Sequence, residues 1–114
     1  MKKRILILGG DMFMDYKFIN NSFISTNNVL LKKLNRKYLI DNFSSYNLDS
    51  SKALNYVKLL LEKYNYEKII IDLDNNDNLV EYLKNRNAEL ILMNEQIIKE
   101  ENKKTYKKQI LSYL

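Results

Sequence analysis

The chain has 114 residues, and its 19 Lys and Arg residues exceed its 14 Asp and Glu residues by a formal net charge of +5. This length predicts a single domain over residues 1–114 that can bury a core of its own. Cysteine and histidine are both absent. Their absence excludes disulfide bonds, thiolate nucleophiles, cysteine-based zinc sites and the commonest general base of enzymes near neutral pH.

The first predicted element is a strand over residues 4–8. Ile5 to Leu8 form a continuous apolar run that ends at Gly9-Gly10, which is typical of a strand buried on both faces. The run is too short for an export signal or a membrane span, although Lys2-Lys3-Arg4 precedes it. We therefore expect a cytoplasmic protein that makes no membrane contact.

Three more strands and four helices follow along the chain. Residues 38–43, 68–73 and 89–93 are further short apolar runs of the strand type. Between and after the strands, apolar residues recur with the 3.6-residue period of a helix. They predict helices around residues 29–34, 53–64 and 79–83, and a last helix that begins near residue 100. The clearest apolar stripe consists of Ala53, Leu54, Val57, Leu60, Leu61 and Tyr64.

Strands and helices thus alternate in the predicted order β-α-β-α-β-α-β-α. Strands separated by helices pair in parallel through right-handed crossovers. The sequence therefore predicts an α/β fold, a three-layer α/β/α sandwich with a short, mostly parallel four-stranded sheet. Ligands of such folds bind beyond the carboxyl ends of the strands, so the loops that follow the strands are the place to look for a site.

The basic residues are distributed along the chain, and many lie next to acidic ones, as in Glu62-Lys63. The densest basic stretch is 103–108 on the last predicted helix, and we interpret it as a solvated helix face. We therefore expect no nucleic-acid partner.

Motifs in three blocks of the chain bear on function. Gly9-Gly10-Asp11-Met12 follows the first strand, Asn42 lies in the second strand block, and Asp74-Asn75-Asn76-Asp77 follows the third strand. In their order and spacing these motifs resemble the SGNH (GDSL) hydrolases over roughly the first two-thirds of the chain. That family has Gly-Asp-Ser-Leu, then an Asn and a Gly, then Gly-x-Asn-Asp. The resemblance implies a flavodoxin-like fold of the SGNH-hydrolase type.

The resemblance carries five residues onto family positions. Gly10 and Asp11 match Gly-Asp, Asn42 matches the Asn of the second block, and Asn76 and Asp77 match Asn-Asp. In the family, the counterpart of Asn76 donates an amide hydrogen bond to the oxyanion of the reaction. Asn76 and Asp77 also suit the N-cap of the helix that follows, and this second interpretation stays open.

The chain departs from the family at the residues that perform catalysis. Met12 stands where the family has its nucleophilic serine, and a thioether has no proton to lose and forms no acyl-enzyme. Ser45 lies near the place of the oxyanion-hole glycine, and Asp74 replaces the glycine of the third block. The family's final Asp-x-x-His block, which supplies the general base, is missing. The family's acyl-transfer mechanism therefore cannot operate in this chain.

The sequence predicts a non-catalytic SGNH-like domain, without a cofactor, that binds a small ligand or a protein partner. A sheet of only four strands is also expected to leave an exposed edge after the last helix, and we expect a homodimer to cover it. One alternative is a residual esterase in which Asp11 or Asp77 activates a water molecule. A second is a receiver-like signalling module in which Asp11, Asp72, Asp74 and Asp77 converge at the carboxyl edge of the sheet, with Asp11, Asp74 and Asp77 as the candidate Mg²⁺ ligands. The candidate ligand-binding residues are Gly10, Asp11, Met12, Asn42, Ser45, Asp74, Asn76 and Asp77.

Overall fold

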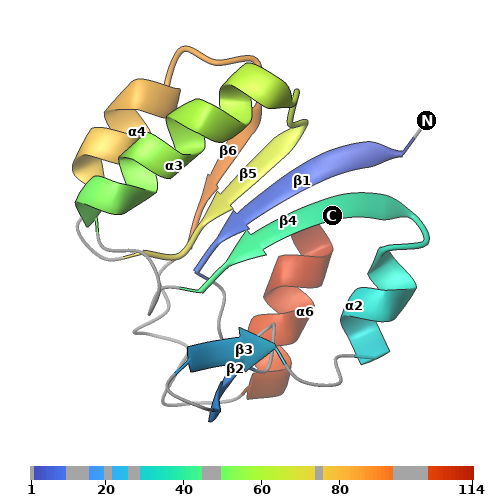
Figure 1. The fold of residues 1–114 in the computed structure, drawn as a ribbon. Coiled ribbons are helices and arrows are strands. Elements are labelled where there is room, and N and C mark those ends of the chain that lie inside the picture. Colours follow the sequence, from blue (N-terminus) through green and yellow to red (C-terminus); the bar gives the residue numbers. More distant parts are fainter. Residues whose placement is uncertain are drawn as a thin grey trace.

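A four-stranded sheet with helices on both faces forms the body of the protein (Figure 1). The structure, a computed structural model, describes residues 2–9, 16–19, 22–25, 29–44, 50–73, 76–93 and 103–114. The elements are β1 (Lys3–Leu8), β2 (Tyr16–Ile19), β3 (Ser22–Ser25), α2 (Val29–Leu34), β4 (Tyr38–Phe43), α3 (Ser50–Lys63), β5 (Lys68–Ile71), α4 (Asp77–Leu83), β6 (Glu89–Leu92) and α6 (Lys103–Tyr113).

The main sheet has the strand order β4-β1-β5-β6, and all of its neighbouring strands are parallel. In the register of the central strands, Leu8 pairs with Phe43 of β4 and with Ile71 of β5. The carboxyl ends of these three strands therefore lie side by side. The predicted α/β class and all four predicted strands of this sheet are confirmed, with ends that differ by at most two residues.

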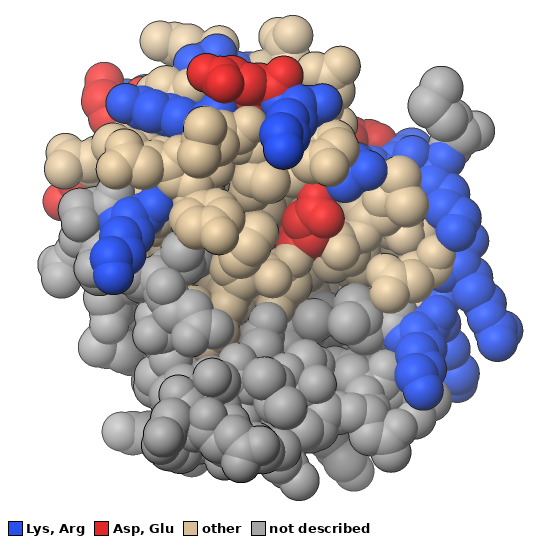
Figure 2. Space-filling model, in the orientation of Figure 1, with Lys and Arg blue, Asp and Glu red and all other residues tan. Residues whose placement is uncertain are grey.

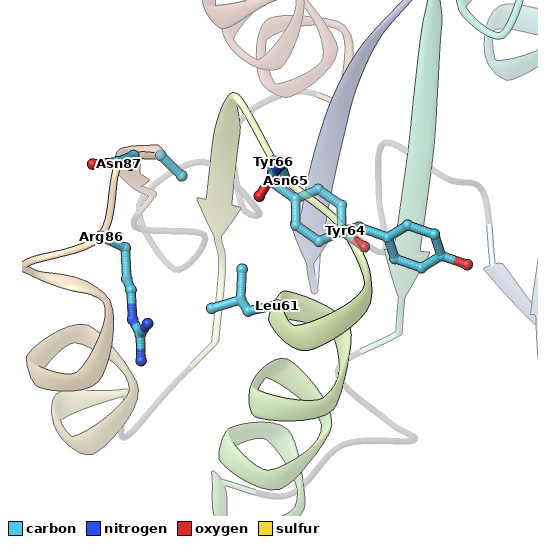
Figure 3. Close-up of a pocket in the computed structure, with 7 residues that line it drawn as sticks. Leu61, Tyr64, Asn65, Tyr66, Arg86 and Asn87 are labelled. Carbon is cyan, nitrogen blue, oxygen red and sulfur yellow. The ribbon is translucent and has the colours of Figure 1, made fainter.

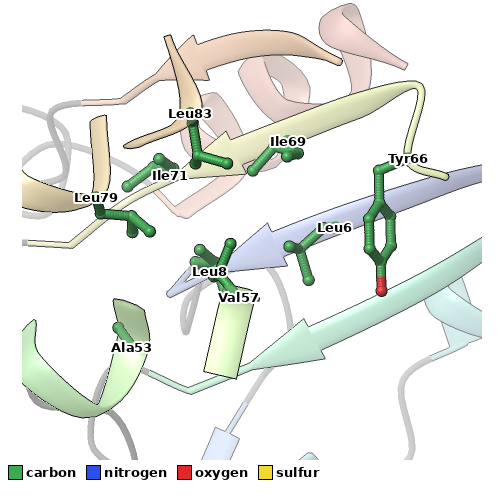
Figure 4. Packing of buried hydrophobic residues seen from close by; sticks show 9 residues of the cluster. All are labelled: Leu6, Leu8, Ala53, Val57, Tyr66, Ile69, Ile71, Leu79 and Leu83. Carbon is green, nitrogen blue, oxygen red and sulfur yellow. The ribbon is translucent and has the colours of Figure 1, made fainter. Parts of the chain in front are cut away.

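The central strand β1 supplies side chains to two separate cores, because successive side chains of a strand point to opposite faces. Ile5 and Ile7 belong to the α6-side core, and Leu6 and Leu8 belong to the α3-side core. Each of these four side chains is almost completely buried, which stabilises the fold by about 1.5 to 3 kcal/mol per side chain. The α6-side core consists of Ile5, Ile7, Tyr38, Ile70, Ile91, Met93 and Ile110. The α3-side core, drawn in Figure 4, consists of Leu6, Leu8, Ala53, Val57, Tyr66, Ile69, Ile71, Leu79 and Leu83.

Helix α3 follows its predicted apolar stripe. Ala53 and Val57 are buried against the sheet, and Leu54, Leu60 and Leu61 pack beside them. Leu59 lies outside the stripe, on the solvent side of the helix. Within the described residues, no helix combines the length and the hydropathy that a membrane span requires.

A two-stranded hairpin, β2-β3, lies in the chain between β1 and α2, where the sequence analysis expects no strand. Its strands are antiparallel, and Ile19 pairs with Ser22, so that two residues separate the strands. The simple alternation of strands and helices is therefore wrong at this place. β2 and β3 have four residues each, as β5 and β6 do, but they have no continuous run of three apolar residues such as Ile69-Ile70-Ile71 to indicate a strand.

A pair of leucine substitutions tests this arrangement. Leu6→Ala should lower the free energy of unfolding by about 2 to 5 kcal/mol, because it removes a side chain that is 0% exposed and leaves a cavity in the α3-side core. Leu92→Ala, at a position of β6 that is 53% exposed, should change it by no more than about 0.5 kcal/mol. Urea unfolding of the two variants measures the difference. Equal losses would contradict the placement of β1 and β6.

Candidate functional site

The carboxyl ends of β1, β4 and β5 meet in a buried polar cluster. The Gly9 amide donates to the Phe43 carbonyl at 2.8 Å, and the Asp72 amide donates to the Leu8 carbonyl at 2.8 Å. The strands are thus held together for one residue beyond their ends. Ser44 and Asp72, which follow β4 and β5, are 1% and 3% exposed. Buried polar groups require partners, and both residues have them.

Gly9 is required at this cluster by a close approach between two stretches of main chain. Its φ angle is +83°, in the left-handed region that favours glycine. A Cβ atom at this position would lie 2.1 Å from the Asp72 carbonyl oxygen. The first glycine of the Gly-Gly pair therefore has a structural role, because it lets the chain turn away from β1 directly against β5.

Asn42 fastens β4 to the end of β1 through its side-chain amide. Its Nδ2 atom lies 3.3 Å from the carbonyl oxygen of Ile7 and 3.2 Å from that of Gly9, and it donates to both. A primary amide has two N–H groups, so these two carbonyls occupy both of them. The Asn that the SGNH resemblance places in the second block thus holds main chain in position.

Asn76 and Asp77 lie at the amino end of α4. The Asn76 carbonyl accepts the Val80 amide at 2.9 Å, and Asn76 occupies the N-cap position. Its side chain makes no capping hydrogen bond to the helix. Instead, its Nδ2 atom donates to the Leu73 carbonyl at 2.9 Å. A side-chain cap from Asn76 is therefore wrong, whereas the exposed carboxylate of Asp77 lies in the first helical turn, where negative charge is favourable.

The other candidate residues lie outside the described residues. These are Gly10, Asp11, Met12, Ser45 and Asp74. Two of the acids proposed for the Mg²⁺ site, Asp11 and Asp74, are among them, so the structure does not test that site, although it describes a buried Asp72 and an exposed Asp77. Within the part of the chain that the structure describes, no group of three or more acidic side chains is arranged to hold a metal ion.

A second polar network lies on the α3 side of the sheet and joins β1 and β4 to the residues before β5. Arg4 donates to Asp41 Oδ2 at 2.9 Å, and the hydroxyl of Tyr66 donates to the same oxygen at 2.5 Å. The Arg4 guanidinium also lies 3.9 Å above the centre of the Tyr64 ring. Burial raises the pKa of the Tyr66 phenol well above its usual range, and the hydrogen bond to Asp41 raises it further. The phenol therefore stays protonated as a donor at every physiological pH.

An open hollow of about 330 Å³ borders this network (Figure 3). Its walls come from Leu61 near the end of α3 and from the α3–β5 and α4–β6 loops. Both loops precede strands, so the hollow lies at the opposite end of the sheet from the candidate residues. Its volume is at the lower limit of small-molecule pockets. The sequence analysis considers only the loops that follow the strands, so it does not identify this hollow, which lies at the other end of the sheet. It is lined by Leu61, Tyr64, Asn65, Tyr66, Arg86, Asn87 and Ala88.

Comparison of the chain with models of protein families, with curated proteins and with solved structures found no match. The SGNH resemblance therefore depends on the three sequence motifs alone. The structural evidence on two of these motifs consists of the hydrogen bonds that the side-chain amides of Asn42 and Asn76 donate to main-chain carbonyls.

Replacement of the buried tyrosine tests the Arg4–Asp41–Tyr66 network. Tyr66→Phe should lower the free energy of unfolding by about 1 to 2 kcal/mol at pH 8, because a hydrogen bond to a charged acceptor is lost. The phenol ionises near pH 10 in the unfolded chain and at higher pH in the folded protein. The stabilising effect of the Tyr66 hydroxyl is thus complete below pH 10 and is lost as the pH rises further. The wild type and Tyr66→Phe should therefore converge in their free energy of unfolding at high pH.

Tyr64→Phe is the matched control, because the Tyr64 hydroxyl makes no hydrogen bond to any described residue and its ring would stay under Arg4. Urea unfolding of the wild type and both variants at pH 8 and at pH 11 gives the comparison. An equal loss for both variants at pH 8 would contradict the special role of Tyr66.

Proposed function

We propose that this chain is a non-catalytic domain of the SGNH-hydrolase type, with a flavodoxin-like fold, that acts by binding. The strand order β4-β1-β5-β6 supports the fold. In terms of sequence it is second, first, third, fourth, which is how a flavodoxin-like sheet begins. The three sequence motifs that resemble the family, in their order and spacing, support the kinship.

The chemistry of the chain supports the loss of catalysis. Met12 stands at the nucleophile position, and no residue of the chain is a histidine. An acyl-enzyme needs a group that attacks the ester and a base that removes its proton. Neither residue of the family mechanism is present, and the loss of one alone removes most of the rate enhancement.

The observation that carries this proposal is the engagement of two amides at family-matched positions, that of Asn42 and that of Asn76, the candidate oxyanion donor. The amide of Asn42 donates to the carbonyls of Ile7 and Gly9, and the amide of Asn76 donates to the carbonyl of Leu73. An oxyanion hole needs donors that are aimed at the place where negative charge develops in the reaction. In this chain the two amides support the main chain at the ends of β1 and β5 instead.

Binding of a protein partner is supported by the surface beside β4, which we name the β4-side surface. β4 forms one edge of the main sheet within the described residues, and an unpaired edge can accept another strand. Leu39 of β4 is exposed on the α3 face of this edge, and Tyr56 and Leu59 of α3 are exposed nearby. The rings of Phe43 and Tyr56, 5.2 Å apart, connect strand and helix at the carboxyl end of β4. The ion pair of Asp41 with Arg4 lies between these rings and Leu39 on the same face, so the surface is apolar with a charged centre. We propose that a second copy of the chain covers it.

Ester hydrolysis tests the loss of catalysis. The purified protein, with and without Mg²⁺, should hydrolyse p-nitrophenyl acetate and butyrate at the rate of the buffer alone. The Asp11→Asn, Asn76→Ala double variant should give the same background rate, because neither side chain takes part in a reaction. A clear rate in the wild type that the double variant lacks would overturn the proposal and favour the residual esterase.

The mass of the protein in solution tests the contact through the β4-side surface. Light scattering should give twice the chain mass of 13.7 kDa, and Leu39→Lys with Leu59→Lys should reduce it to the mass of one chain, because buried lysines in an apolar contact are unfavourable. Leu92→Lys, at an equally exposed leucine on the other edge strand, is the matched control and should leave the dimer intact. A wild type that stays monomeric at high concentration would contradict the self-association.

A further inference from the structure

A basic patch, which we name the α2 patch, covers α2, the turn after it and the start of β1. The Nζ atom of Lys2 donates to the Asn35 carbonyl at 2.7 Å, and this contact brings the start of β1 next to the α2–β4 turn. Figure 2 shows blue atoms gathered along the right margin of the molecule, beside β1 and α2. The patch consists of Lys2, Lys32, Lys33, Arg36 and Lys37, all of which are exposed.

The charge of the α2 patch is not neutralised within the described residues. The adjacent basic residues of β1 do have partners, since Lys3 pairs with Glu67 at 3.1 Å and Arg4 pairs with Asp41 at 2.9 Å. None of the five patch residues forms an ion pair with a described acidic residue. When these five are set aside, 14 basic residues remain against 14 acidic ones in the whole chain. The α2 patch thus carries a charge equal to the net charge of the protein.

The local backbone directs this charge outward. Leu34 of α2 packs against the α6-side core, so the neighbouring lysines of the helix face solvent. The Arg36 amide donates to the Lys33 carbonyl at 3.3 Å, which continues the helical turn beyond α2. Residues four apart are neighbours on a helical surface. Lys32 and Arg36 therefore form one row, and Lys33 and Lys37 form a second row beside it.

We propose that the α2 patch binds the phosphodiester backbone of a nucleic-acid duplex without sequence specificity. Lys and Arg side chains are the groups that neutralise phosphates and give such binding its affinity. Proteins that bind single strands add exposed aromatic rings on which the bases stack. The aromatic residue at this patch, Tyr38, is only 8% exposed beneath Lys37, so it provides no stacking platform.

The same side chains argue against an acidic membrane as the partner. A helix that lies on a membrane inserts an apolar face between the lipids. The apolar residue of α2 with a described side chain, Leu34, is already packed against the protein's own core. Among the side chains that the structure describes, the patch thus offers charge for a phosphate backbone and no apolar surface for lipid chains.

The number of cations sets the expected salt dependence. Each neutralised phosphate contributes about −0.9 to the slope of log K against log salt concentration on a duplex. Five contacts would give a slope of about −4.5, so affinity should fall by on the order of 10² to 10³ between 50 and 200 mM salt. This dependence measures how many of the five residues contact phosphates at once.

Fluorescence anisotropy with a short labelled DNA duplex, its RNA counterpart and a single strand of the same sequence tests the proposal. The variant Lys32→Gln, Lys33→Gln, Arg36→Gln should bind the duplexes at least about 10-fold more weakly, with a slope that is smaller by about 2.7. The control variant Lys58→Gln, Lys63→Gln, Lys84→Gln removes the same charge from three exposed positions away from the patch. Lys58 and Lys63 lie on α3, and Lys84 follows α4. This variant should bind like the wild type.

Three outcomes would overturn the proposal. The first is an equal loss of affinity in both triple variants, which would show that net charge alone is responsible. The second is tighter binding to the single strand than to either duplex. The third is binding to vesicles that contain phosphatidylserine without binding to any duplex, which would assign the patch to an acidic membrane. Circular dichroism of both variants confirms that the substitutions at exposed positions leave the fold intact.

Discussion

The burial of β1 on both faces is the constraint on which the rest of the structure depends. Ile5, Leu6, Ile7 and Leu8 are at most 1% exposed, and each contributes to one of two cores. Because β4 and β5 flank β1, every other layer is positioned relative to it. The close approach of Gly9 to Asp72 at its end and the Arg4–Asp41–Tyr66 network near its start both join β1 to its neighbours. These two sets of polar contacts are therefore organised around a strand whose apolar side chains are buried on both faces.

Much of this fold can be predicted from the sequence, because a strand buried on two faces is a continuous apolar run and a helix on such a sheet has a 3.6-residue stripe. The runs at residues 5–8 and 69–71 and the stripe that begins at Ala53 are examples. The hairpin β2-β3 was not predicted, because its strands have no continuous run of three apolar residues and its pairing is local. Its sequence signal is a pair of residues, Asn20-Asn21, between two short segments rich in aromatic and β-branched residues.

Site residues were harder to predict than elements, because a motif identifies a side chain but not the groups around it. Asn42 and Asn76 match the hydrolase pattern, yet the carbonyls that occupy their amides come from β1 and from the end of β5. Charge shows the same limit. The densest basic run in the sequence is 103–108, whereas the α2 patch gathers Lys2 with residues 32–37 through a contact between distant segments. The presence of acidic residues next to basic ones in the sequence therefore does not predict which residues form ion pairs in the folded protein.

The position of β1 in the chain also has a consequence during synthesis of the protein. β1 leaves the ribosome before both of its partners, and β5 ends at Ile71, more than half of the chain later. At about 5 to 20 residues per second, the apolar run of β1 waits several seconds for that partner. Apolar segments exposed in this way aggregate unless charged residues adjoin them. Lys2, Lys3 and Arg4 place three positive charges directly before this run, the kind of flanking charge that opposes aggregation of an apolar segment.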